Sequence, residues 1–327
     1  MEKKTLSKII EKYSIFIVLV AMIILCALLS PNFLSFNNFR NVARQLSVSI
    51  IIAYGEMILV ISGLIDLSVG SVLALAGVFS IASYKSTGSL LLAFVVAILV
   101  GVICNLINAF LVTNLKVPPF IATLAMQMTA RGLALYFTHG QNLLKLKDYT
   151  VFGQGSVGPI PNPVIFMVII TLIIAYVVNH TRYGRSLYAI GGNEAAAIAS
   201  GIDVVRSKYI TFIINGVLAG IAGVLFMSRV NAGLPNGAVG YEMEGLTAAI
   251  VGGTSFSGGV GTTIGTLAGA FIIGFLNNIM NLTGVDSYIQ QMVKGAIIAI
   301  AVAYDIMSKN KKTRKVIIVD DKDKKKA

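Results

Sequence analysis

Long apolar runs recur along this chain of 327 residues and predict helices that cross a membrane. A helix needs roughly 20 consecutive apolar residues to cross the hydrocarbon core of a bilayer. Four uncharged runs reach or approach that length: residues 13–30, 90–112, 209–227 and 263–282. Shorter or weaker runs occupy residues 46–62, 69–84, 120–137, 164–178, 246–253 and 289–304. The pattern predicts an all-α, polytopic integral membrane protein with about ten transmembrane helices.

Two glycine-containing segments interrupt the pattern, residues 61–71 and residues 251–263. The second reads VGGTSFSGGVGTT. Backbone that leaves the helical conformation at membrane depth is stable only where protein or water satisfies its polar groups. We therefore predict broken or re-entrant helices beside a cavity, an arrangement that transporters use at their substrate sites. The glycines expected to break the second segment are Gly252, Gly253, Gly258, Gly259 and Gly261.

Similar landmarks in the two halves of the chain suggest an internal repeat. The sequence LAG occurs at residues 75–77 and again at residues 267–269. Paired asparagines follow it in each half: Asn105 with Asn108, and Asn278 with Asn281. Repeated halves are common in transporters, and the substrate route often lies between them. Because the spacings between the landmarks differ, a duplication and a chance resemblance both stay open.

Basic residues predict the orientation of the chain, because cytoplasmic loops of membrane proteins carry an excess of Lys and Arg. They cluster in residues 3–12, at Lys116, in residues 181–208 and in residues 309–327. With ten crossings all four clusters fall on one side, so we expect both termini to be cytoplasmic. The basic residues on the opposite side are Arg40, Arg44, Lys145 and Lys147. The predicted organisation is a permease domain over residues 1–308 and a basic, disordered cytoplasmic tail over residues 309–327.

Composition supports a membrane protein and argues against nucleic-acid binding. Apolar residues make up 56% of the chain and charged residues only 12%, far from the usage of a soluble domain. The net charge of +12 would suggest nucleic acid in a soluble protein. Here the basic residues border apolar runs and do not form a stripe with interleaved aromatic residues. Orientation and contact with anionic membrane lipid account for them.

Charged residues inside the apolar runs are candidates for the transport pathway, because a charge at the centre of a membrane is costly unless it is paired or hydrated. The candidates are Glu56, Asp66, Arg131 and Lys294. They could form ion pairs that fix helix register, or they could line the path of a hydrophilic solute. The neutral polar residues proposed to accompany them are Ser68, Asn105, Asn108, Asn278 and Asn281. Many neutral donors and acceptors favour a cargo rich in hydroxyl groups over an ion.

The loop at residues 181–208 contains a predicted short helix. Asn193 is placed to cap it, Glu194 supplies an acidic residue in its first turn, and alanines follow. Gly201 is a plausible stop. A short helix has little stability alone, so we expect it to dock on a partner, although a position on the membrane surface is the alternative. The residues assigned to this loop are Arg182, Gly184, Gly191, Gly192, Asn193, Glu194, Ala195 and Gly201.

Several motifs together resemble the permease subunits of bacterial ATP-binding cassette (ABC) importers for monosaccharides, the ribose and galactoside group. They are GLIDLSVGS at residues 63–71, VPPFIATLAMQMTARG at 117–132, TRYGRSLYAIGGNEAAAIASGI at 181–202 and VGGTSFSGGVGTTIGTLAG at 251–269. Similarity continues through NNIMNLTGVDSYIQQMVKGAI, so it covers nearly the whole chain. Leu64 and Ala125 depart from the pattern, since the family often has glycine there.

The resemblance implies a partner ATPase, an extracytoplasmic sugar-binding protein and a second copy of the permease. It also implies that the loop around Glu194 is the coupling helix that fits the ATPase, and that the sugar belongs to the ribose, galactose or methyl-galactoside, or xylose class. The chain has no GxxxxGK[ST] phosphate-binding motif. We therefore expect ATP and Mg²⁺ to bind the partner, with no cofactor or metal on this chain and no enzyme activity of its own.

The sequence leaves two other classes of function as alternatives. An ion-coupled secondary transporter or channel would use Glu56, Asp66, Arg131 and Lys294 as its charge relay, and would need no ATPase. An intramembrane enzyme is the weaker alternative. The chain has only two histidines, no HExxH motif and no pair of acidic residues on one predicted helix face.

Overall fold

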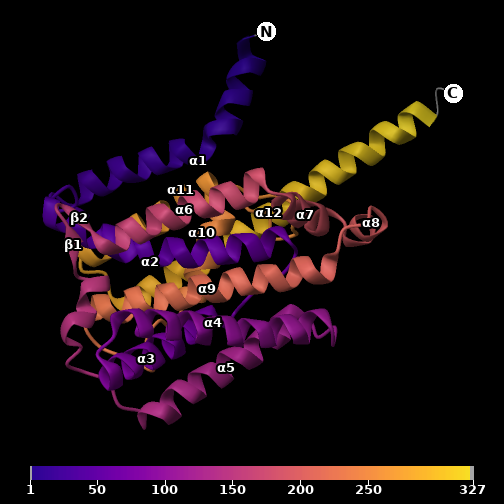
Figure 1. Ribbon diagram of the computed structural model, residues 1–327. Helices are drawn as coiled ribbons and strands as arrows, with labels where there is room; N and C mark the ends of the chain where they lie inside the picture. Colours follow the sequence, from indigo (N-terminus) through magenta and orange to yellow (C-terminus); the bar gives the residue numbers. More distant parts are fainter. Residues whose placement is uncertain (1, 325–327) are drawn as a thin grey trace.

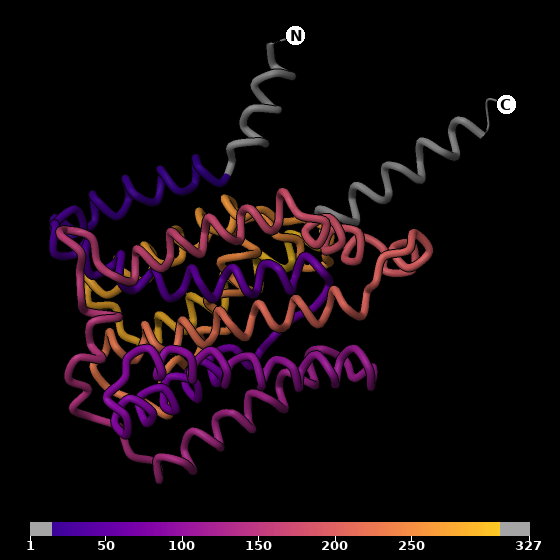
Figure 2. Tube along the Cα trace, viewed as in Figure 1, coloured from indigo at the N-terminus to yellow at the C-terminus, as the bar shows by residue number. Residues whose placement is uncertain are grey.

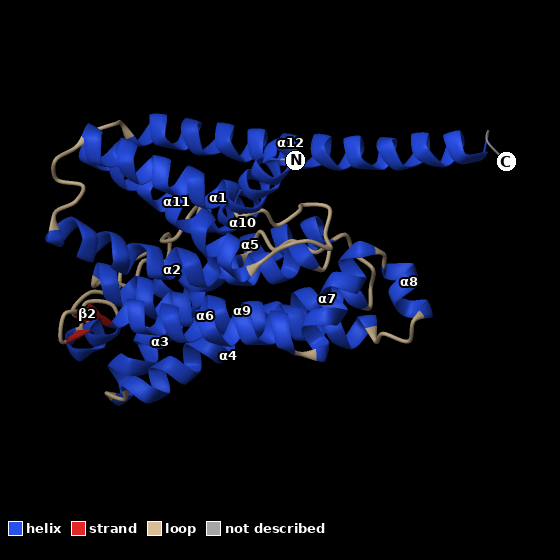
Figure 3. Cartoon of the chain, turned by 90° about the horizontal axis from the view of Figure 1, so that it is seen from above, coloured by secondary structure: helices blue, strands red, loops and turns tan. Residues whose placement is uncertain are grey.

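The computed structural model describes residues 2–324, and side chains are described for residues 15–307. Helices account for most of this part (Figure 3). The elements in order are α1 (Glu2–Leu29), α2 (Phe36–Ile61), α3 (Val69–Thr87), α4 (Leu90–Thr113), α5 (Pro119–Thr138), η1 (Lys147–Phe152), β1 (Ser156–Val157), β2 (Ile160–Pro161), α6 (Asn162–His180), α7 (Arg182–Gly192), α8 (Glu194–Ala199), α9 (Val204–Val230), α10 (Tyr241–Val251), α11 (Thr263–Leu282) and α12 (Ser287–Lys324).

The long helices lie side by side in one bundle (Figures 1 and 2). Helix α9 is central, because it packs against α2, α3 and α4. The antiparallel pair β1–β2 lies at one end of the bundle, which we call the hairpin end. Helix α8 projects at the opposite end, which we call the α8 end (Figures 1 and 3). Which end faces the cytoplasm stays a prediction.

Side-chain caps fix where several helices begin, because the first backbone N–H groups of a helix have no partner within it. The hydroxyl of Ser35 accepts a hydrogen bond from the amide of Asn38 at the start of α2. Ser89 does the same for α4, and Thr262 for α11. Ser89 and Thr262 come directly before the apolar runs at 90–112 and 263–282, so local sequence sets these two boundaries.

Glycines let the central helices touch through their backbones. A methyl group at Gly101 of α4 would collide with the carbonyl oxygen of Gly216 on α9. A methyl group at Gly269 of α11 would likewise collide with the carbonyl oxygen of Ala248 on α10. Small residues at helix interfaces permit this close approach in membranes, where packing contributes much of the association energy. The structure thus gives these glycines a packing role.

The predicted number of about ten crossings is not confirmed. Within the described residues, seven helices are long and apolar enough to cross a membrane: α2, α3, α4, α6, α9, α11 and the part of α12 at Ser287–Met307. The apolar part of α1, Ile15–Leu29, is shorter than these, and α5 is not among them. The run at 246–253 is not a span, because α10 has only 11 residues and ends at Val251.

Helix α10 is instead a half-length helix, as predicted for a broken segment. Residues 231–240 approach it as turns, and residues 252–262 leave it without helical structure. The first break, between α2 and α3, covers residues 62–68. Both predicted interruptions of the helical pattern therefore exist, and their bounds lie one to three residues from those expected.

The landmarks of the suggested internal repeat do not match helix for helix. In the first half, residues 75–77 belong to α3, whereas Asn105 and Asn108 belong to α4. In the second half, the corresponding landmarks all lie within α11. Helix α12 continues to Lys324, so it includes most of the predicted tail, and residues 325–327 lie outside the described part. Disorder of residues 309–327 stays a prediction.

Candidate translocation site and coupling segment

A buried polar network, the Asp66 cluster, joins the break between α2 and α3 to α4 and α9. Asp66 Oδ1 accepts a hydrogen bond from the amide of Ser68, 2.7 Å away, and a short one from the Ser68 hydroxyl. Asn215 Nδ2 donates to Asp66 Oδ2 at 2.7 Å and to Asn105 Oδ1 at 3.3 Å. Asn108 Nδ2 donates to Ser68 Oγ at 3.1 Å. All five side chains are buried, so the network fixes the broken segment inside the bundle.

Glu56 and Arg131 lie near this region but do not pair with each other. Glu56 is fully buried, and its side chain packs against Gly245 of α10. Arg131 donates from Nη1 to the carbonyl oxygens of Pro235 and Gly237, each at 2.7 Å. Those carbonyls belong to the turns before α10, so Arg131 holds the entry to the half-length helix.

Lys294 forms the intramembrane ion pair that the sequence left open, and its partner is Glu244. Lys294 Nζ lies 2.9 Å from Glu244 Oε1. The same carboxylate accepts from Asn277 Nδ2 at 2.8 Å and from Ser49 Oγ at 3.3 Å. The Lys294 side chain is 34% exposed and that of Glu244 is 13% exposed. The pair therefore joins α10, α11 and α12 while remaining accessible from one side.

Two cavities lie along the interface of α10, α11 and α12, which we call the α10–α12 cleft. The first has a volume of about 480 Å³ and is lined by Glu244, Lys294 and further polar residues. These are Gln45, Thr247 and Gln291. It provides carboxylate, ammonium, amide and hydroxyl groups in one place, and such groups fit a solute with many hydroxyls.

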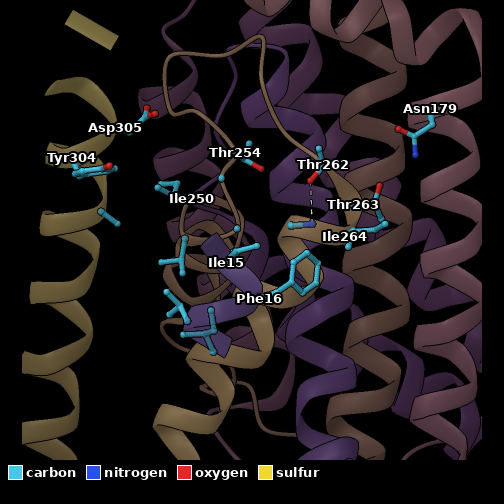
Figure 4. A pocket seen from close by; sticks show the side chains of 17 residues that line it. Ile15, Phe16, Asn179, Ile250, Thr254, Thr262, Thr263, Ile264, Tyr304 and Asp305 are labelled. Atoms are coloured by element: carbon cyan, nitrogen blue, oxygen red, sulfur yellow. Dashed lines mark hydrogen bonds between the residues drawn. The ribbon is translucent and has the colours of Figure 1, made fainter. Parts of the chain in front are cut away.

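The second cavity has a volume of about 700 Å³ and lies farther along the same helices toward the α8 end. In Figure 4, Thr254 and Thr262 of the α10–α11 connection face it from one side, and Tyr304 and Asp305 of α12 lie on the other. Asp305 Oδ2 accepts from the Ser255 hydroxyl at 3.0 Å. This contact ties α12 to the connection, so the second cavity shares its walls with the broken segment.

The segment 181–208 forms two short helices at the α8 end. Asn193 caps α8 as predicted, because its Oδ1 accepts from the amide of Ala196 at 3.0 Å. Gly201 follows the helix with φ of +80°, as expected for a stop. Lys208 Nζ lies 2.9 Å from Glu194 Oε1. Ala195 and Ile198 of α8 are exposed, so an apolar face is displayed beyond the bundle.

Gly191 brings α7 into contact with both broken segments. A methyl group there would collide with the carbonyl oxygen of Ile61, the last residue of α2. The same carbonyl accepts from the amide of Gly259 at 2.8 Å. Tyr188 donates from its hydroxyl to the carbonyl of Gly261 at 2.8 Å. Burial raises the pKa of the Tyr188 phenol, so the hydroxyl keeps the proton that it donates. Helix α7 is therefore packed against the end of α2 and hydrogen-bonded to the α10–α11 connection.

The remaining predicted residues lie in several places. Asn278 exchanges hydrogen bonds with Asn38 near the hairpin end, and Asn281 accepts from Gln290. Neither asparagine belongs to the Asp66 cluster. Gly252 packs against Gly265, and Gly253 and Gly258 have positive φ angles. Of the loop residues, Gly184 is buried at the start of α7, and Arg182 and Gly192 are exposed.

Sequence reasoning missed Glu244, Glu242, Asn215 and Asp305. The first two stand in the sequence GYEMEGL, which enters an apolar run, so two acidic residues at the edge of a predicted span were the available signal. Asn215 lies in a long apolar run, where a single amide gives little signal. In the part of the chain with described side chains, no group of three or more His, Cys, Asp or Glu is placed to hold a metal ion.

The described part of the chain thus combines helices long enough to cross a membrane with a half-length helix and a polar cleft. Residues 38–302 match the family described as branched-chain amino acid transport system / permease component, and the chain belongs to this family. No solved structure matches the chain.

Curated relatives cover almost the whole chain. It is 40% identical over 295 residues to the ribose import permease protein of Escherichia coli (strain K12), covering 88% of this chain and 92% of that protein. It is 39% identical to the ribose import permease protein of Bacillus subtilis (strain 168), covering 91% and 93%. It is 35% identical to the L-arabinose transport system permease protein of Escherichia coli (strain K12), covering 91% of each.

Proposed function

We propose that this chain is the membrane-spanning permease of an ATP-driven importer and conducts a monosaccharide into the cytoplasm. The relatives are permeases for ribose and L-arabinose, and another, 38% identical, is a D-allose transport system permease. These cargoes are small, neutral and rich in hydroxyl groups. Such a solute needs many neutral donors and acceptors, and the α10–α12 cleft provides them. Ribose, galactose and xylose therefore belong in the same test panel.

The proposed route follows the α10–α12 cleft. It passes the Glu244–Lys294 pair and continues toward Thr254 and Thr262, where the second cavity lies. Helix α12 forms one wall of the cleft, and none of its residues from 287 to 307 is buried. A single chain therefore leaves this helix uncovered. A second copy of the permease would cover it. The extracytoplasmic sugar-binding protein would deliver the sugar at the hairpin end.

The observation that carries the proposal is the contact of Gly191 with Ile61 and with the α10–α11 connection. ATP and Mg²⁺ would bind the partner ATPase, whose closure would pull α8 and α7 together. Because α7 touches both broken segments, its displacement would change the cleft between α10 and α12. Differential contacts of α8 in two states would drive alternating access. Both termini and α8 would then lie in the cytoplasm.

A branched-chain amino acid is a second candidate cargo, because the family description names one. The Glu244–Lys294 pair offers one charge of each sign, which would suit a zwitterion. The relatives favour a sugar, and leucine is the appropriate competitor in the transport assay. An ion-coupled carrier would use the same charges without an ATPase, and the assay below separates that case as well.

The test is uptake of labelled ribose, galactose, xylose and leucine in vesicles that contain this chain, its ATPase and its binding protein. Glu194→Lys reverses a charge on α8, and Asp148→Lys makes the same change on the exposed hairpin end. We expect ATP-dependent sugar uptake that Glu194→Lys abolishes together with ATPase association, while Asp148→Lys retains the ATPase. Uptake that persists without the ATPase and follows an ion gradient would refute the proposal.

A further inference from the structure

Two arginines at the hairpin end have no acidic partner. Arg40 and Arg44 lie one turn apart on α2. Arg40 Nη2 donates to the Ser156 hydroxyl at 3.1 Å, and Arg44 Nη2 donates to the carbonyl of Gln154 at 2.6 Å. Among residues with described side chains, the ion pairs are Lys208–Glu194 and Lys294–Glu244, so neither arginine is neutralised. In addition, Nε of both arginines is buried without a hydrogen-bond partner.

In the orientation proposed above, the hairpin end faces away from the cytoplasm, whereas the excess of Lys and Arg belongs to cytoplasmic loops. Like charges one helical turn apart also repel each other. An anion between the two guanidinium groups would remove this repulsion.

An apolar groove of about 310 Å³ begins beside Arg40. Its walls come from the start of α2, from β2, from α6 and from α11. Phe36 and Phe39 at its edge are 68% and 65% exposed, so the groove opens to the surroundings of the bundle. Farther in, Pro159, Ile160, Val164, Met167 and Phe271 supply apolar walls.

We propose that this groove holds an acyl chain of an anionic phospholipid, whose phosphate lies between the guanidinium groups of Arg40 and Arg44. Any lipid tail could fill an apolar groove, so the charge decides the occupant. Guanidinium groups bind phosphate oxygens through paired, charge-assisted hydrogen bonds. The lipid would connect α2 to the β1–β2 hairpin, because Ser156 and Gln154 already accept from the same arginines.

The first test measures lipid retention by the full-length chain. The protein is purified in a mixture of phosphatidylglycerol and phosphatidylcholine, and the bound lipid is identified by native mass spectrometry. We expect retention of phosphatidylglycerol over phosphatidylcholine by about tenfold, from hydrogen bonds to a charged group. The double variant Arg40→Gln/Arg44→Gln should abolish this preference. Equal retention of the two lipids by the wild-type chain would refute the proposal.

The matched control is Lys145→Gln/Lys147→Gln, which removes two exposed charges from the same end without touching the groove. It should leave lipid selectivity unchanged. If both double variants lower retention equally, the attraction is a general effect of charge and the proposed site does not exist. If the arginine variant keeps its lipid but loses binding to an acidic soluble protein, the surface serves a protein partner and the lipid proposal is wrong.

A second measurement needs no variant and so does not depend on folding of the altered chain. Phosphatidylglycerol with a photoreactive group on its acyl chain is added to the wild-type protein, and labelled peptides are sequenced. The label should appear within residues 159–167 or on α11 near Phe271. Labels spread evenly over exposed helices such as α4 and α5 would contradict a specific groove.

Discussion

Two carboxylates inside this bundle, those of Asp66 and Glu244, are stabilised in different ways. In the Asp66 cluster, a carboxylate is enclosed by neutral donors from Ser68 and Asn215, and the whole network is buried. At the Glu244–Lys294 pair, a carboxylate faces a cation across 2.9 Å beside an open cavity. A charge within a membrane requires either dense hydrogen bonding or a partner with access to water. The buried Asp66 cluster therefore suits a structural role, and the Glu244–Lys294 pair suits a place on the transport route.

The difference shows why burial matters more than residue type in assigning a function. Asp66 and Glu244 are both acidic residues at membrane depth, yet Glu244 lines a cavity of about 480 Å³ whereas Asp66 is buried. Each variant below therefore tests one side of this comparison by asking whether it changes stability or transport.

The largest effect is expected for Asp66→Ala. This change leaves the buried amide and hydroxyl of Ser68 without their acceptor and leaves Asn215 Nδ2 with only Asn105 Oδ1. Each unsatisfied buried group costs about 1–3 kcal/mol. We expect the free energy of unfolding to fall by about 3 kcal/mol in total. Helical signal during titration with a denaturing detergent measures it. Asp148→Ala, at an exposed position, is the control and should change stability little. If Asp66→Ala keeps its stability and loses only transport, Asp66 acts in the translocation pathway and not in the architecture.

The second effect is on transport. Lys294→Met removes the cation of the cleft and leaves Glu244 with the amide of Asn277 and the hydroxyl of Ser49. Since the site is partly hydrated, we expect stability to change by less than about 1 kcal/mol. Sugar uptake should fall by about tenfold, which corresponds to about 1.4 kcal/mol in binding.

Uptake at several sugar concentrations separates binding from translocation for Lys294→Met. Lys145→Met, at the exposed hairpin end, is the matched control and should leave uptake unchanged. A large loss of stability in Lys294→Met with normal uptake per folded molecule would reverse the comparison, because the pair would then be structural.

Much of the helical framework could be predicted from the sequence, because apolar length and caps are local properties. Asn193 is predicted to begin α8 as its cap and Gly201 to follow its end, and both predictions are confirmed. The number of crossings was less accessible. An apolar run of eight residues gives no sign of whether its helix spans the bilayer or begins inside it, and α10 turned out to be a half-length helix.

The contents of the site were harder to predict, since they depend on contacts between distant segments. The sequence indicates Asp66, Asn105 and Asn108 as polar residues in or beside apolar runs, and in the structure all three are buried. Asn215 completes their network from 149 positions away from Asp66. Lys294 was identified without its partner. Glu244 lies 50 positions before it, and only packing of α10 against α12 brings the two together.

A smaller effect is expected for Asn193→Ala, which removes the cap of α8. Loss of a helix cap costs about 1 kcal/mol, and α8 has only six residues over which to recover it. Because about 1.4 kcal/mol corresponds to a tenfold change in affinity, we expect ATPase association to weaken by about fivefold. The free energy of unfolding of the bundle should not change. Asn193→Asp keeps an acceptor at the cap and should restore binding. Equal weakening by both variants would show that the amide itself contacts the ATPase.

The smallest effect separates two roles of Glu194. Its side chain is 47% exposed and pairs with Lys208, whose side chain is only 11% exposed. An exposed ion pair contributes about 0.5 kcal/mol and is screened by salt, so Lys208→Met should barely alter folding. If Glu194 serves mainly to contact the ATPase, Glu194→Gln should weaken association while Lys208→Met leaves it intact. If the two variants weaken ATPase association equally, the Glu194–Lys208 pair orients α8 and the Glu194 carboxylate makes no separate contact with the ATPase. Weaker ATPase binding by the wild-type chain at high salt than at low salt would support that result.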